Sequence, residues 1–183
     1  IFCLGEYVPK NNCCHTFFYK EVDLEQKKRR VCKQCGFIDY RNPKLVSGSL
    51  VLKNNKFLLC KRAIEPSYGK WTFPSGYIDE GETPEEGAIR EAKEEVNIKI
   101  KLEKLFIIFT VRNKNLIQFV FIAKQLNKTF KPGIETLDAK YFDYDEIPWK
   151  SLAFPSVAYA IKKFRKYSKK RLIFHTFSKD LGF

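Results

Sequence analysis

Methionine is absent from the 183-residue sequence, and no apolar run reaches the length of a membrane-spanning helix. Position 1 is Ile1, so we expect that an N-terminal segment, with any targeting peptide, has been removed. The lack of a long apolar run excludes a helical membrane protein. We therefore expect an intracellular protein, in the cytoplasm or in an organelle, with no membrane partner.

Acidic residues are the minority charge, with 21 Asp and Glu against 34 Lys and Arg, and the formal net charge is +13. Such a balance favours polyanionic partners. Much of the positive charge lies in two runs, of which the first is Lys27–Arg30. The second comprises Lys162, Lys163, Arg165, Lys166, Lys169, Lys170 and Arg171. Each run is read either as a solvated face or as a surface that attracts phosphate-rich substrates or RNA.

Internal repeats and low-complexity tracts are also missing, and the length suits one ordinary domain with a small appendage. Five of the six cysteines lie in residues 1–42, which marks that segment as separate from the rest. We therefore predict a zinc-ribbon-like segment at 1–42 and a larger domain at 43–183.

The zinc prediction rests on Cys32 and Cys35, which are followed by Gly36 in a typical zinc-knuckle pattern. A second Cys-x-x-Cys pair is missing. At most two further ligands would come from Cys3, Cys13, Cys14 and His15. The alternative is a degenerate ribbon that its aromatic residues hold together without zinc.

One stretch reverses the overall charge, because residues 76–98 hold eight acidic side chains. Thr83, Pro84 and Glu86 form a capping box with proline at the first helical position, and Asn97 suits a helix end. The apolar positions of this predicted helix are Ala88, Ile89, Ala92 and Val96. Their small size indicates close packing against a sheet.

Glu91, Glu94 and Glu95 are spaced three and four apart on this helix, so they lie near one another and near its C-terminal end. Like charges there destabilise a bare helix, and bound Mg²⁺ or Mn²⁺ would compensate them. Arg90 would anchor a carboxylate or a substrate phosphate. The alternative is a solvated, Glu-rich face.

The remaining sequence predicts a mixed sheet with flanking helices. Alternating apolar residues indicate a hairpin over residues 49–60, strands over 99–102, 105–111, 116–123 and 139–144, and a second helix over 155–167. We therefore expect an α/β fold.

The acidic stretch resembles the Nudix hydrolase pattern G-x5-E-x7-R-E-U-x-E-E-x-G-U, where U is a bulky aliphatic residue. Seven positions match in register, and Ala92 and Asn97 are mild departures. The resemblance implies an α/β/α sandwich that hydrolyses a nucleoside diphosphate linked to another moiety. It implies metal ligands and catalytic residues at Gly76, Glu82, Arg90, Glu91, Glu94 and Glu95. A distant glutamate, for which Glu135 is the best candidate, is an alternative general base.

Segments outside this pattern, such as residues 59–72, 131–135 and 145–156, resemble the zinc-ribbon subgroup that includes plant FAD and ADP-ribose pyrophosphatases. That likeness implies cleavage of FAD or ADP-ribose with release of AMP, contacts to substrate from Arg62, Tyr77 and Glu135, and allows a homodimer. The alternatives are NADH pyrophosphatase activity, an enzyme or binding protein directed at capped RNA, and an inactive Nudix-fold module.

Overall fold

Strands make up most of the regular structure in residues 16–22, 27–167 and 173–177, which the computed structural model describes. The chain divides into two compact units, Ile1–Asn42 and Pro43–Phe183. The smaller unit contains β1 (Phe17–Glu21), β2 (Lys28–Cys32) and β3 (Ile38–Asp39), which form an antiparallel sheet in that order.

A tight turn follows β2 and includes both cysteines of the predicted knuckle. The amide of Gly36, a residue with a φ of 74°, donates to the carbonyl of Cys32 at 3.0 Å. Cys32 is buried and Cys35 is half-buried. The other predicted zinc ligands, Cys3, Cys13, Cys14 and His15, lie outside the described residues. No group of three or more metal-binding side chains occurs in the described ranges, so the zinc site stays a prediction.

The larger unit holds two α-helices, α1 (Pro84–Val96) and α2 (Pro155–Tyr167), in its described residues. Its strands are β4 (Lys44–Lys53), β5 (Lys56–Arg62), β6 (Trp71–Thr72), β7 (Ser75–Tyr77), β8 (Ile100–Val111), β9 (Leu116–Gln125), β10 (Thr136–Phe142) and β11 (Ile173–Phe177). Short 3₁₀ helices are η1 (Arg112–Lys114), η2 (Tyr144–Glu146) and η3 (Trp149–Ser151).

These strands form one mixed sheet in the order β10-β5-β4-β9-β8-β11, with β6 paired to β5 and β7 paired to β4. The β4–β9 and β8–β11 pairs are parallel, and the other pairs are antiparallel. The mixed sheet predicted from the sequence is therefore confirmed.

Two strand boundaries differ from the prediction. The strands expected at 99–102 and 105–111 are one strand, β8, because two shifts of register let it stay paired with β9. The strand expected at 139–144 is β10, which ends at Phe142 because Asp143 and Glu146 form a capping box that begins η2. Strand β11 was not predicted.

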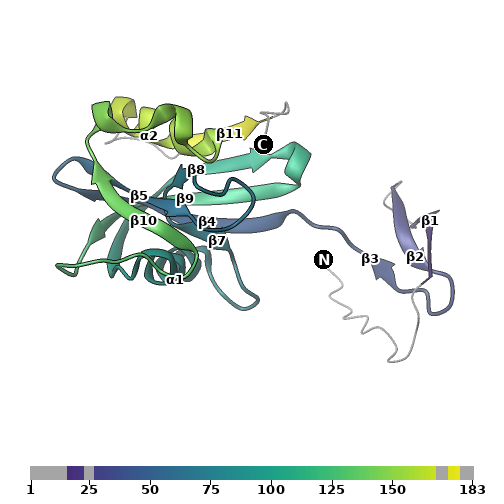
Figure 1. The fold of residues 1–183 in the computed structure, drawn as a ribbon. Coiled ribbons are helices and arrows are strands. Elements are labelled where there is room, and N and C mark those ends of the chain that lie inside the picture. Colours follow the sequence, from purple (N-terminus) through teal and green to yellow (C-terminus); the bar gives the residue numbers. More distant parts are fainter. Residues whose placement is uncertain (1–15, 23–26, 168–172, 178–183) are drawn as a thin grey trace. The chain divides into compact units, whose positions relative to one another are not determined.

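The two helices cover opposite faces of the sheet (Figure 1). Helix α2 buries Val157, Ala160 and Ile161 in a core that includes Phe106 and Phe109 of β8. Helix α1 buries Ala92 and Val96 against Val51 of β4 and Leu58 of β5 in a second core. Each predicted helix thus covers one face, and the acidic segment lies on the α1 face. Ile89, which was predicted for the apolar face of α1, is 43% exposed instead.

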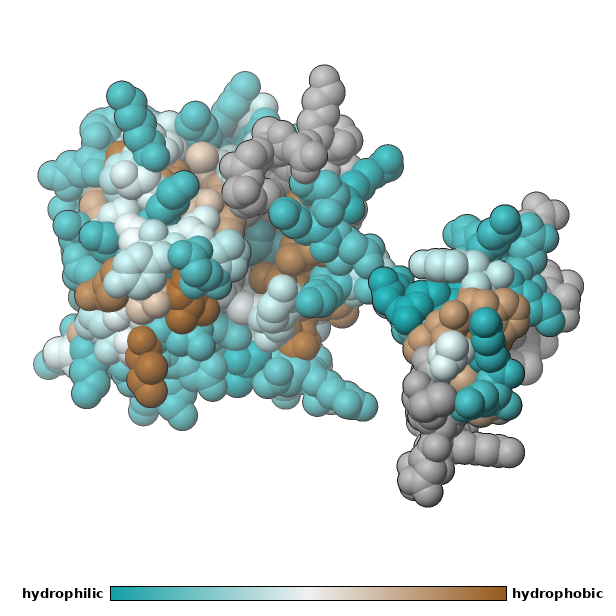
Figure 2. Space-filling view, turned by 45° about the vertical axis from the view of Figure 1, so that its right-hand side comes forward, coloured by the Kyte–Doolittle hydropathy of each residue, from teal (hydrophilic) through white to brown (hydrophobic). Residues whose placement is uncertain are grey.

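No helix in the described part of the chain is long and apolar enough to cross a membrane. In the view of the larger unit in Figure 2, hydrophobic residues form separate patches among hydrophilic ones.

Candidate active site

Helix α1 is held firmly at both ends. The side chain of Thr83 accepts a hydrogen bond from the Glu86 amide at 3.2 Å, while the Glu86 carboxylate accepts one from the Thr83 amide at 2.8 Å. Ser47 of β4 donates its hydroxyl to the carbonyl of Pro84. At the other end Asn97 adopts the left-handed conformation (φ 49°, ψ 36°). The capping box and the helix end predicted from the sequence are therefore confirmed.

The segment before β10 packs against the C-terminal end of α1. The Gly133 amide donates to the carbonyl of Glu95 at 2.7 Å, and the Lys131 amide donates to the carbonyl of Val96 at 3.1 Å. A side chain on Gly133 would collide with the carbonyl oxygen of Glu94. This packing brings the segment that carries Glu135 next to the acidic residues of α1.

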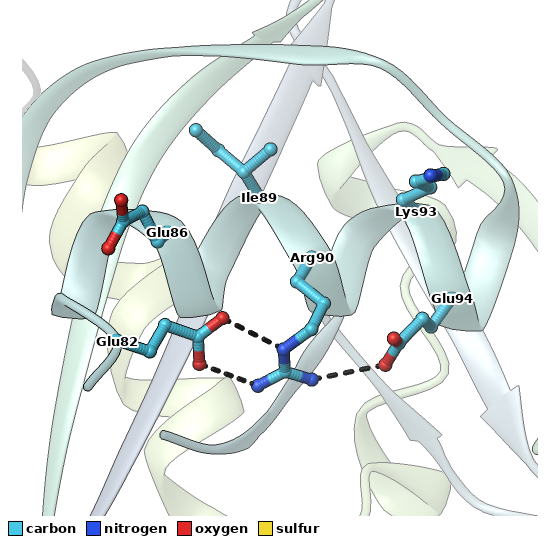
Figure 3. A pocket seen from close by; sticks show the side chains of 6 residues that line it. All are labelled: Glu82, Glu86, Ile89, Arg90, Lys93 and Glu94. Atoms are coloured by element: carbon cyan, nitrogen blue, oxygen red, sulfur yellow. Dashed lines mark hydrogen bonds and ion pairs between the residues drawn. The ribbon is translucent and has the colours of Figure 1, made fainter. Parts of the chain in front are cut away.

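Arg90 is the centre of an acidic network on the outer side of α1 (Figure 3). Its Nε and Nη2 atoms each lie 2.9 Å from an oxygen of Glu82, in a bidentate pair. Its Nη1 atom lies 2.7 Å from Glu91 Oε1 and 3.0 Å from Glu94 Oε2. Its Nη2 atom also donates to the carbonyl of Tyr77 at 2.8 Å. Arg90 thereby fastens the loop after β7 to the helix.

This network shifts the pKa values of the charged groups in it. The hydrogen bonds from Arg90 are the largest cause that lowers the pKa of Glu82, and the Asp79 amide lowers it further. The same pairing raises the pKa of Arg90. Both groups are therefore held in their charged forms.

The three glutamates of the predicted metal site have different surroundings. The side chain of Glu94 is 59% exposed and that of Glu91 is 13% exposed, whereas Glu95 as a whole residue is 6% exposed. The spacing of these residues predicted one shared side. Because α1 packs on the sheet, that side is divided into a solvent edge with Glu94 and a buried edge with Glu95.

Glu95 is a buried carboxylate with two hydrogen-bond donors. The Ser75 amide and the Cys60 thiol lie 3.1 Å and 3.5 Å from its Oε2 atom. Burial, together with the nearby charge of Glu91, raises its pKa to about 8. For Glu91 itself burial is the main cause of a raised pKa, with smaller contributions from the charges of Glu94 and Glu135. The site therefore holds carboxyl groups where water is scarce, so burial disfavours their ionised forms unless a cation compensates the charge.

Cys60 is a buried member of this site that was not among the residues predicted for it from the sequence. Burial raises the pKa of its thiol well above the ordinary value, and Glu95 adds to the shift. The sequence held one signal for this contact. Cys60 follows Leu58 by two residues on β5, so both side chains lie on the face of the strand that meets α1.

Gly76 lies directly against the carboxylate of Glu91. An added Cβ would fall 2.6 Å from Glu91 Oε2 and closer still to the other two carboxylate atoms. Gly76 pairs with Ser47 of β4, so the strand cannot move away from the helix without breaking the sheet. Only glycine allows the backbone and the carboxylate to approach this closely.

The predicted substrate-contacting residues surround this centre. Tyr77 is 55% exposed, and the ammonium of Lys44 lies 5.2 Å from its ring centroid. Arg62 donates from Nε to the carbonyl of Pro66 at 2.9 Å and lies close enough to lower the pKa of Glu95. Glu135 is exposed, and its carbonyl accepts from the Ala63 amide at 2.9 Å.

A shallow depression runs along the outer side of α1 beside this network. It is lined by Glu82, Glu86, Ile89, Arg90, Lys93 and Glu94 (Figure 3). No three metal-binding side chains in the described residues are grouped to hold an ion. The guanidinium of Arg90 lies between Glu82, Glu91 and Glu94 instead.

Known proteins are similar to this chain in sequence and in fold. A family model described as the NUDIX domain matches residues 43–164. A Methanocaldococcus jannaschii protein named ADP-ribose pyrophosphatase is 32% identical, over 63% of this chain and 69% of that protein. A Chromobacterium violaceum protein named NAD-capped RNA hydrolase NudC is 29% identical, over 74% of this chain and 51% of that protein.

This chain thus spans about half to two thirds of the length of these two curated relatives. A crystal structure of a NUDIX hydrolase from Nitrosomonas europaea has a TM-score of 0.83 and 32% identity, and the match covers 91% of this chain and 97% of that one. The chain therefore belongs to the NUDIX domain family and is a Nudix hydrolase.

Proposed function

We propose that this chain hydrolyses the pyrophosphate bond of a nucleoside diphosphate linked to another moiety, with Mg²⁺ or Mn²⁺ as cofactor and AMP as one product. The observation that carries the proposal is the pair Glu91 and Glu95. Two carboxylates one helical turn apart lie in a region that excludes water, and burial raises the pKa of both. Such an arrangement is costly unless a cation is bound there.

The residues present fit a hard divalent cation. Carboxylate and carbonyl oxygens are the ligands that Mg²⁺ and Mn²⁺ prefer. Glu91, Glu94 and Glu95 would hold the ion, with Glu82 and the Gly76 carbonyl as further ligands. A carboxylate has about four lone-pair positions, so the single bond from Arg90 to Glu91 leaves acceptor capacity free.

When bound, the metal would neutralise phosphate charge and make an attacking water more acidic. The protein's own groups would position the metal ligands. Arg90 holds Glu82 to the helix and orients Glu91 and Glu94. The Ser75 amide and the Cys60 thiol fix Glu95 from below.

Glu135 is our first candidate for the general base that takes a proton from the attacking water. Its charge contributes to the raised pKa of Glu91, which supports a role beside the proposed metal ligands. It is also exposed, so a water molecule would reach it. Glu94, which is exposed on the same side, is the second candidate.

For the substrate we propose ADP-ribose first and FAD second. ADP-ribose is favoured because the archaeal relative is named for that activity. FAD rests on the likeness of the segments outside the acidic stretch to plant-type enzymes. In this proposal the exposed ring of Tyr77 stacks on a base, and the guanidinium of Arg62 binds a phosphate.

The test is a substrate panel with product identification by chromatography. It would include ADP-ribose, FAD, NADH, coenzyme A, diadenosine polyphosphates and capped RNA, each with Mg²⁺ and then with Mn²⁺. We expect AMP together with ribose 5-phosphate or FMN. Turnover of capped RNA alone would favour an RNA-directed enzyme, the activity named in the Chromobacterium violaceum relative. No turnover of any member would refute the proposal.

We also propose that Cys32 and Cys35 bind zinc together with ligands among Cys3, Cys13, Cys14 and His15. The turn at Gly36 brings the two described cysteines to one end of the small sheet. Measurement of metal content per chain tests this proposal, with Cys32→Ser and Cys35→Ser as variants. Less than one zinc per ten chains, after purification without chelators, would reject it.

A further inference from the structure

The outer face of α2 carries positive charge that the proposed reaction does not use. Helix α2 contains Lys162, Lys163, Arg165 and Lys166 and no acidic residue. The helix dipole accounts for cations in the last turn, Arg165 and Lys166. It does not account for Lys162 and Lys163, which begin one turn earlier.

Each of these cations lies over an aromatic ring. Arg165 is 4.0 Å from the ring centroid of Tyr144, and Lys162 is 5.2 Å from that of Trp149. Lys163 is 5.1 Å from the Tyr159 ring and 5.3 Å from the Tyr167 ring. Lys166 is 5.2 Å from the Tyr167 ring.

The rings themselves form two pairs, one before the helix and one between the helix and β11. Tyr144 and Trp149 meet edge to face at 5.1 Å, before the helix begins. Tyr159 stacks on His175 of β11 at 4.1 Å with an angle of 24°. We call this group of four cations and their rings the α2 surface.

Little negative charge balances this surface. In the described residues, Arg165 is the only one of the four cations with a carboxylate within 4.0 Å, and that contact, to Asp145, is 3.6 Å long. The accumulated charge also acts on neighbouring groups. A hydrogen bond from Lys166 is the main cause that lowers the pKa of Tyr167, and the charges of Lys166 and Lys163 lower it further. Burial is the main cause that lowers the pKa of His175, and the charge of Lys163 adds to it.

We propose that the α2 surface binds single-stranded nucleic acid. Ammonium and guanidinium groups would meet the phosphates, and the exposed ring of Tyr167 would stack on a base. Cation–ring contacts at exposed sites are weak, so a phosphate competes well for each cation. Stacking on an exposed aromatic side chain adds affinity for any base, because every base has a flat aromatic face.

The pattern favours nucleic acid over the other polyanions. An acidic peptide or a free phosphate chain would use the cations but not the rings. An acidic membrane would need exposed apolar anchors, and in the described part of this surface only Tyr167 is among the large exposed hydrophobic residues, at 42%. An exposed ring beside several cations suits a polymer that offers bases beside phosphates.

This surface lies on the face of the sheet opposite to α1 (Figure 1). It is therefore separate from the glutamates of the candidate active site, and binding there does not depend on the proposed reaction. Its role would be to hold a polymer against the protein, whatever small substrate the α1 face accepts.

Binding of a fluorescent single-stranded RNA of about 20 nucleotides with a 5′-hydroxyl end would test this inference. The variant is the triple reversal Lys162→Glu, Lys163→Glu and Lys166→Glu in the full chain. The matched control is Lys53→Glu, Lys99→Glu and Lys101→Glu, which changes the net charge equally at exposed lysines elsewhere. ADP-ribose hydrolysis and thermal unfolding report on the folded state of every variant.

We expect the α2 reversal to weaken RNA binding at least about tenfold and to reduce the slope of log K against log salt by about 2, since each phosphate contact contributes about 0.7. The control reversal should weaken binding less than about threefold, because it removes no proposed phosphate contact and changes only the overall charge. Equal weakening by both reversals would overturn the inference, because it would show a general charge effect.

Tyr167→Leu tests the rings separately from the charge. RNA binding should weaken about fivefold or more, as the loss of one stacked base requires, while binding of inorganic polyphosphate stays unchanged. Polyphosphate or phosphatidylserine vesicles that bind as tightly as the RNA, and lose binding equally in the lysine reversal, would overturn the assignment to nucleic acid.

Discussion

Gly76 of β7 and Glu91 of α1 are in such close contact that a single methyl group on the glycine would collide with the whole carboxylate. The contact joins a strand held in the sheet to the helix that carries the proposed metal ligands. The sheet side of this contact is rigid, so any added atom must displace Glu91.

Gly76→Ala should therefore remove activity more than stability. Displacement of a positioned group by about 1 Å costs on the order of 10²-fold in rate, whereas overpacking costs about 1–3 kcal/mol. Steady-state kinetics with ADP-ribose and chemical denaturation measure the two effects. Ser75→Ala adds no atom beside Glu91 and serves as the control. Full activity of the Gly76→Ala variant would show that catalysis does not require the observed position of the Glu91 carboxylate.

Glu95 should make the metal-free protein less stable as the pH rises. Its pKa in the folded state is about 8, above the ordinary value of 4.5, so between these values the folded state binds more protons than the unfolded state. Its contribution is fully present below about pH 4.5 and is lost as the pH approaches 8. The expected decline is about 1 kcal/mol per pH unit between pH 5.5 and 7.5.

Urea denaturation in EDTA across that pH range measures this decline. Glu95→Gln should flatten it, because the amide does not titrate, whereas the exposed control Glu80→Gln should leave it as in the wild type. Saturating Mg²⁺ should also flatten the wild-type curve, since a metal would hold the ionised carboxylate. A wild-type curve that is flat in EDTA would contradict the buried state of Glu95.

Arg90 should be replaceable by neither lysine nor alanine. Lysine keeps the charge but loses the planar fork that contacts Glu82, Glu91 and the Tyr77 carbonyl together. We expect Arg90→Lys and Arg90→Ala each to lower kcat at least about tenfold, by the misplacement of positioned groups. Added guanidinium should partly restore Arg90→Ala and not Arg90→Lys. Equal activity of the lysine variant would mean that charge alone matters.

Glu135→Gln separates proton transfer from metal binding. General-base catalysis contributes about 10²–10⁴-fold, so kcat should fall by about that factor while the Mg²⁺ concentration for half-maximal activity stays the same. Glu91→Gln, in contrast, should raise that Mg²⁺ concentration. If Glu94→Gln shows the behaviour expected of Glu135→Gln, then Glu94 is the base and Glu135 is a surface residue.

Several features of α1 could be predicted because they depend on neighbours in the sequence. Thr83, Pro84 and Glu86 form the capping box through backbone groups within one turn. Asn97 ends the helix because its short side chain tolerates the left-handed conformation. The pairing of Arg90 with Glu94 follows from a spacing of four residues.

Other features depend on segments that are distant in the sequence. The burial of Glu95 requires β5 and β7 to lie beneath α1, and the contact of Cys60 with Glu95 joins residues 35 positions apart. The continuous strand β8 depends on bulges that only its pairing with β9 reveals. No local pattern records such pairings.

The sequence by itself determined the helix, its caps and the acidic pattern that identifies the family, because these follow from spacing along one element. Only the tertiary structure decided which glutamate is buried, which is exposed and which is held by Arg90. The physical reason is that pKa and accessibility depend on the sheet beneath the helix, and the strands of that sheet come from distant parts of the chain.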